Sequence, residues 1–141
     1  MDPDNPVVKL CVKGMQAEAG DRSDEASIFF MQAWEASKDD YDACIAAHFM
    51  ARHQVSPQDM QHWNEVALIR ANAVGDERVR TFYPSLYLNM GYSYELLGNW
   101  TEARRYYQLA AGKVDDLPDG SYSEVVRNGI ANGRKRVGLT E

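Results

Sequence analysis

The chain has 141 residues, of which 45% are hydrophobic and 26% are charged, and its formal net charge is −6. This length and composition suit one folded domain with its own core and exclude a disordered chain. No run of about 18 apolar residues occurs, so we expect no membrane span. The acidic charge disfavours non-specific binding to nucleic acid, and the opening residues MDPDNPVV lack the pattern of a secretory signal.

Four helices are predicted in the first half of the chain, separated by short polar breaks. Pro6 can open the first helix, because proline has no N–H to leave unpaired in a first turn. Asp40 is expected to cap the third helix, and Ser56 followed by Pro57 is a start signal for the fourth. The predicted ranges are about 6–19, 23–37, 41–54 and 57–74.

The second half begins with an ambiguous segment around Pro84. A helical pattern resumes near Glu77, and we favour a long helix from about Val79 that bends at Pro84, with a helix start at Pro84 as the alternative. A last helix is expected over about 122–136. The basic residues at its end suit the negative pole of a helix better than they suit a separate binding patch.

Residues 84–116 carry the clearest pattern, two helices joined by a tight turn. Gly98 is expected to end the first helix, and Asn99 to cap the second with Glu102 answering it. Glycine inside a helix costs about 1 kcal/mol relative to alanine, so Gly91 predicts a close approach, as does the small Ala103. The two apolar stripes are Leu86, Tyr87, Met90, Gly91 and Tyr94, then Ala103, Tyr107, Ala110 and Val114.

This stretch resembles the tetratricopeptide repeat (TPR). The family pattern is an aromatic, Leu-Gly and Tyr on one helix, then Ala, an aromatic and Ala on the next. Ala33, Ala67 and Ala110 mark three such second helices, at intervals of 34 and 43 residues, and the first interval is the TPR period. The residues that match in the third unit are Tyr87, Met90, Gly91, Tyr94, Gly98, Trp100, Ala103, Tyr107 and Ala110.

The resemblance implies an all-α fold, a right-handed superhelical stack of about three helix-turn-helix units with a C-terminal capping helix, about seven helices in all. We expect a single domain over 1–141. The units are about 6–38, 40–75 and 77–117, and the capping helix is about 120–137.

Two units depart from the pattern. The interval from Gly20 to Ala26 is one residue longer than that from Gly98 to Ala103, which leaves the register of the first helix open. In the middle unit His48 stands in place of the glycine.

A TPR stack exposes an inner face made by the first helix of each unit, and such faces hold a peptide or a partner helix. The resemblance therefore implies a non-enzymatic protein or peptide interaction module without a cofactor, with self-association possible. The amide of Asn89 could hold a peptide backbone, and Arg52 could pair with a carboxylate. The alternative is that these residues simply face solvent. Candidate lining residues are Met15, Glu18, Asp42, Ile45, Phe49, Arg52, Ser85, Leu88, Asn89, Tyr92 and Glu95.

No catalytic motif occurs: there is no phosphate loop and no nucleophile elbow, so we do not expect an enzyme. The alternative function is a small helical ligand- or metal-binding domain, or an enzyme, with a pocket between the second and third units. Its support is the grouping of His48, His53, His62 and Asp42. Cys11 and Cys44 belong to no motif, and we expect two buried thiols in a reducing, cytoplasmic setting.

Overall fold

The computed structural model describes residues 2–139, and the regular elements of this part of the chain are all helical. This confirms the all-α prediction and the expected number of seven α-helices for the described residues. The α-helices are α1 (Pro6–Ala19), α2 (Ser23–Ala36), α3 (Asp40–Met50), α4 (Pro57–Val74), α5 (Tyr83–Leu96), α6 (Trp100–Ala111) and α7 (Ser121–Arg136). Short 3₁₀ segments are η1 (Ala51–His53), η2 (Glu77–Phe82) and η3 (Val114–Asp116).

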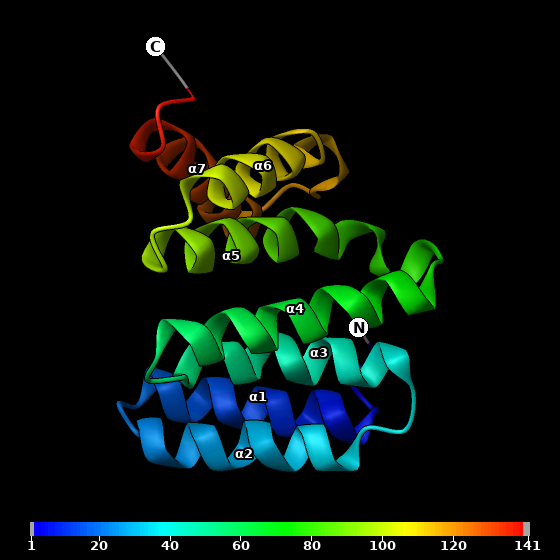
Figure 1. Ribbon diagram of the computed structural model, residues 1–141. Coiled ribbons are helices and arrows are strands. Elements are labelled where there is room, and N and C mark those ends of the chain that lie inside the picture. The colour runs from blue at the N-terminus through cyan, green and yellow to red at the C-terminus, as the bar shows by residue number, and fades with distance from the viewer. Residues whose placement is uncertain (1, 140–141) are drawn as a thin grey trace. The chain divides into compact units, whose positions relative to one another are not determined.

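Consecutive helices pack in pairs, and the contacts divide the chain into two compact units (Figure 1). The first unit holds α1 to α4: α1 pairs with α2, α3 pairs with α4, and α3 also lies against α1 and α2. The second unit holds α5, α6 and α7: α5 pairs with α6, and α7 packs on both. The expected single domain stays a prediction.

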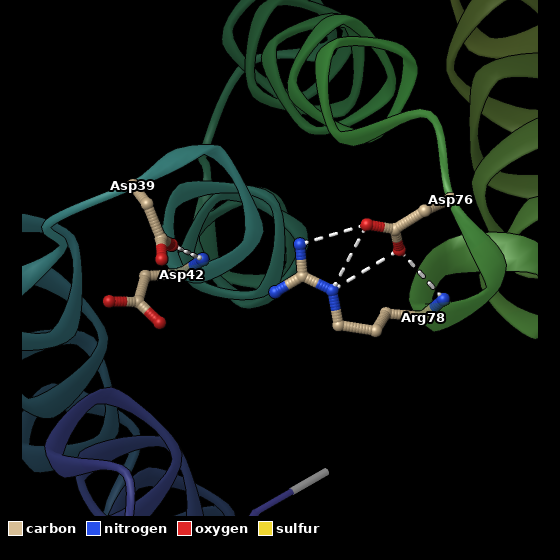
Figure 2. Close-up of polar contacts among 4 residues, drawn as sticks. All are labelled: Asp39, Asp42, Asp76 and Arg78. Carbon is tan, nitrogen blue, oxygen red and sulfur yellow. Dashed lines mark hydrogen bonds and ion pairs between the residues drawn. The ribbon is translucent and has the colours of Figure 1, made fainter.

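The cap of α4 follows the sequence signal, and the cap of α3 differs from the prediction by one residue. Ser56 Oγ accepts from the N–H of Asp59 at 3.0 Å at the start of α4, as predicted. The cap of α3 is Asp39 rather than Asp40, because the extended backbone of Asp39 lets its Oδ1 accept from the N–H of Asp42 at 2.8 Å (Figure 2). Asp40 lies inside the helix and pairs instead with Arg70 at 2.8 Å.

The expected long helix bent at Pro84 is wrong. Residues Glu77–Phe82 form 3₁₀ turns, and α5 begins at Tyr83 with Pro84 in its first turn, where the missing N–H leaves no acceptor unpaired. At the start of η2, Asp76 Oδ1 accepts from the N–H of Arg78 at 3.0 Å, and the two side chains form an ion pair (Figure 2). This local turn takes the place of the helical turn that the pattern near Glu77 predicts.

The turn between α5 and α6 closes as a Schellman motif. The N–H of Gly98 donates to the carbonyl of Glu95 at 3.0 Å, and the N–H of Asn99 donates to Tyr94 at 2.9 Å. Gly98 has φ 75°, which favours glycine. Asn99 caps α6 by accepting from the N–H of Glu102 at 3.2 Å. The expected return bond from Glu102 is wrong, because the N–H of Asn99 is already used.

The turn between α1 and α2 repeats this bonding 77 residues earlier in the chain. The N–H of Asp21 donates to Glu18 at 3.1 Å, and the N–H of Arg22 donates to Ala17 at 2.8 Å. Asp21, with φ 58°, therefore stands where Gly98 stands, and Gly20 does not. The extra residue expected in this turn is wrong: the two pairs share one register from first helix to second.

Each of these two pairs buries an aromatic ring against a glycine. A Cβ on Gly14 would lie 2.3 Å from Cε1 of Phe30, and a Cβ on Gly91 would lie 2.8 Å from Cδ1 of Tyr107. Both rings are 0% exposed, and each stands sixteen residues after its glycine. The close approach predicted for Gly91 is confirmed, and its partner is the ring. The alanines that flank the rings are also 0% exposed, namely Ala26, Ala33, Ala103 and Ala110.

The α3–α4 pair differs from the other two in its connection, which runs through η1, and in its chemistry. The carbonyl of Ser56 accepts from the N–H of Met60 at 3.0 Å, as that of Asn99 does for Ala103. Counted 43 residues before Gly91 and Tyr107, the positions of the glycine and the ring hold His48 and Asn64, and Asn64 is only 4% exposed. Desolvation by burial, together with the charge of Arg52, lowers the pKa of His48 to about 4.

Candidate partner-binding surface

In the first unit, the predicted lining residues lie where α3 meets α1. Asp42 is 7% exposed, and its carboxylate accepts from the Asn5 side chain at 2.8 Å and from the N–H of Lys38 at 3.2 Å. The bond from Asn5, the N-cap of α1, ties the start of α3 to the start of α1. Met15 is half-buried and Ile45 is buried. Asp42 and Ile45 therefore serve the contact between the helix pairs.

Phe49 and Arg52 form the far end of the same row. The ring of Phe49 stacks on Phe30, with centroids 5.1 Å apart and planes at 18°. The guanidinium of Arg52 lies 5.4 Å from the Phe49 centroid and pairs with Glu18 at 3.0 Å. The second oxygen of Glu18 lies 2.6 Å from His53. The Arg52 side chain is 47% exposed, so its charge is the part of this row that faces solvent.

In the second unit, α7 covers part of the predicted row of α5. The hydroxyls of Ser85 and Tyr122 lie 2.8 Å apart. Leu88 lies against Gly129 of α7, where a Cβ would be 3.0 Å from its Cδ2. Ser85 and Leu88 thus hold α7 in this structure.

Glu95 completes the contact with α7 through a three-membered network. The hydroxyl of Tyr107 donates to Glu95 Oε1 at 2.6 Å, and Arg136 Nε donates to Oε2 at 2.8 Å. Burial acts to raise the pKa of Glu95, but the bonds from Arg136 and Tyr107 outweigh it, so that this pKa is lowered. Burial and the bond to Glu95 raise the pKa of Tyr107 well above its usual value. The three side chains fasten α5, α6 and α7 together.

The exposed part of the α5 row is apolar. Tyr92 is 44% exposed and Leu96 is 45% exposed. They stand four residues apart and so share a face of the helix. Asn89, one turn before, is half-buried. The sequence indicated Tyr92 and missed Leu96, although the four-residue spacing from Tyr92 was a signal for it.

The residues of the alternative site do not form a ligand set. His53 pairs with Glu18, and Asp42 accepts a hydrogen bond from Asn5. The His62 and Trp63 rings lie edge to face, with their centroids 5.4 Å apart. Across residues 2–139, no three His, Cys, Asp or Glu side chains are grouped as metal ligands.

Both cysteines are buried and carry free thiols, as expected, and burial raises the pKa of Cys11 and of Cys44 to about 12. Within the same described range, no helix has the length and apolar character needed to cross a bilayer.

Comparison of the chain with protein-family models, with curated proteins and with solved structures finds no match.

Proposed function

We propose that the chain is a non-enzymatic interaction module built from TPR-like helix pairs, and that it binds a protein or peptide partner. The observation that supports this is the repetition of one packing unit 77 residues apart. Gly14 with Phe30 and Gly91 with Tyr107 have the same spacing, the same close approach and the same turn bonding. The TPR resemblance then implies binding through the first helices.

The exposed residues of the two rows define the proposed contacts. Tyr92 and Leu96 offer an apolar anchor on α5, and aromatic anchors dominate many interfaces. Arg52 offers a guanidinium held in place by Glu18 and Phe49, which suits a carboxylate of the partner. A pre-positioned guanidinium loses little side-chain entropy on binding. Asn89 remains a candidate for contact with a partner backbone.

Capture of partners by the immobilised full-length chain tests the proposal. We expect Tyr92→Ala and Arg52→Ala each to weaken a specific partner about tenfold, which corresponds to about 1.4 kcal/mol. Asn89→Ala tests the amide. The matched controls are Ile69→Ala, an exposed apolar residue on α4, and Arg22→Ala, an exposed arginine paired with Glu25. Capture that is unchanged by all three variants would count against both rows.

The location and the alternative function lead to separate expectations. Two buried free thiols support a reducing, cytoplasmic location. A ligand- or metal-binding domain would be stabilised in a thermal-shift screen with metals and metabolites. We expect no stabilisation, because His53 and Asp42 are engaged by neighbours within their own unit.

A further inference from the structure

Helix α7 packs on the α5–α6 pair in the same way that α3 packs on the α1–α2 pair. In the second unit, Gly133 of α7 lies against the Tyr107 ring. At the corresponding position of the first unit, Phe49 of α3 stacks on Phe30. An arginine–glutamate ion pair occurs at the end of α7 and again in η1, directly after α3. Arg136 binds Glu95 at 2.8 Å, and Arg52 binds Glu18 at 3.0 Å. Gly133 and Arg136 each stand 84 positions after their counterparts, Phe49 of α3 and Arg52 of η1, so α7 occupies the place of a following first helix.

The surface beneath α7 selects for small residues. We call Ser85, Leu88, Glu95 and Tyr107 the α7 seat. A Cβ at position 133 would lie 2.4 Å from Cε1 of Tyr107, whose ring is 0% exposed and hydrogen-bonded to Glu95. The ring therefore cannot give way easily, and a side chain there would push the helix off. At position 129, a Cβ would lie 3.0 Å from Cδ2 of Leu88, which restricts the size of a side chain there.

The seat also selects for a positive charge. The Glu95 side chain is 13% exposed and accepts from Arg136 Nε on one oxygen and from Tyr107 on the other. A partly buried carboxylate with one oxygen directed at the seated helix favours a guanidinium. The seated pattern is glycine, glycine four residues later, and arginine three residues after that.

Helix α7 is itself weakly built. Gly129 and Gly133 stand where α3 has Ile45 and Phe49, and glycine is among the poorest helix formers. Its N-cap is Gly120, with no side-chain capping bond. The buried apolar side chains of α7 are Val126 and Ile130, and Val137 at its C-cap is buried with Ala103 and Tyr107. A helix held by so little apolar surface opens more readily than α5 or α6.

We propose that the α7 seat is a helix-binding site, which α7 occupies as an exchangeable intramolecular ligand. Its external ligand is an amphipathic helix of a partner protein that carries the same glycine, glycine and arginine pattern. This inference rests on the proposed function and specifies it further. The partner helix competes with α7 for the seat, so the opening of α7 regulates binding.

The test uses the full-length chain and a fluorescent peptide with the sequence of residues 119–139. In the wild-type chain the tethered α7 outcompetes the peptide, because its effective concentration is in the millimolar range. We expect the Gly133→Val chain, whose own α7 is displaced by Tyr107, to bind the wild-type peptide at least tenfold more tightly. A peptide carrying Gly133→Val or Arg136→Glu should bind neither chain.

The control chain is Ala131→Val, which makes a comparable change on the exposed side of α7 and should behave as wild type. A Gly133→Val chain that melts cooperatively and does not bind the peptide would overturn the proposal. If that chain does not fold, hydrogen exchange on the wild-type chain decides the question. Amides of α7 should exchange at least tenfold faster than those of α5 and α6, and equal rates would overturn the proposal.

The peptide test and the partner test fail independently. If the peptide does not bind but partner capture still depends on Tyr92 and Arg52, only the proposed helix-binding site is refuted. Peptide exchange without dependence on Tyr92 and Arg52 would remove the proposed rows and leave the seat.

Discussion

Replacement of Gly14 by alanine sets two effects of opposite sign against each other. Alanine is the better helix former, and in an open helix position the change would stabilise the protein by about 1 kcal/mol. The new Cβ, however, would lie 2.3 Å from Cε1 of Phe30 and 2.7 Å from two more ring atoms. Phe30 is 0% exposed, with Phe49 stacked at 5.1 Å and His53 at 5.5 Å. The ring therefore has little room to move.

Overpacking of a filled core costs about 1–3 kcal/mol. We expect a cost near the upper end of this range, because Phe49 and His53 also pack against the Phe30 ring and leave it little room to move. We therefore expect Gly14→Ala to lower the free energy of unfolding by a net ~2 kcal/mol, measured by urea denaturation followed with circular dichroism. Gly112→Ala is the control, because its Cβ would meet carbonyl oxygens at an ordinary 3.5 Å. A Gly14→Ala chain as stable as the control, or more stable, would refute the close-approach argument.

Gly91, Glu95 and His48 are also expected to affect the stability of the chain. Gly91→Ala, with its Cβ 2.8 Å from the Tyr107 ring, should destabilise by about 1 kcal/mol in the same denaturation assay, less than Gly14→Ala. The folded-state pKa of Glu95 is lowered, so its contribution to stability is present above the unfolded pKa of about 4.3 and lost as pH falls through the folded value. Melting curves between neutral and acidic pH should show a smaller acid loss in Glu95→Gln, and an equal loss would contradict this role. The folded-state pKa of His48 is about 4, below the unfolded value of about 6.5, so stability should fall by up to about 3 kcal/mol as pH drops between these values. A His48→Gln chain should lack that dependence, and its persistence would place the titration elsewhere.

The helices were predictable because their ends carry local chemistry. Ser56 and Asn99 cap helices through bonds that span only a few residues, and Gly98 closes its turn through its positive φ. The prediction failed where two local solutions competed. Asp39 and Asp40 are both good caps, and only the fold decides which one is extended. Asp21 adopts φ 58°, a backbone conformation that favours glycine. An aspartate in the sequence does not by itself predict this conformation.

The candidate surface was harder to predict. Helix periodicity shows which side of a helix a residue lies on, but it does not show which other helix packs against that side. The row of Asp42 and Phe49 does lie away from the partner helix, but it meets α1 and Phe30 there. Glu95 likewise meets Arg136, 41 residues later in the chain. Such long-range pairs have no local signature in a single sequence. The repetition of Glu18 with Arg52 and of Glu95 with Arg136 becomes visible only once the helices are paired.

Site-specific photo-crosslinking tests most directly whether the exposed face of α5 contacts a partner. A benzoylphenylalanine at position 92 in the full-length chain places the probe on that face, and the same probe at position 69 is the control on an exposed position of α4. We expect a discrete partner adduct from position 92 that is absent from position 69. Adducts of equal yield from both positions, or none from position 92, would contradict it.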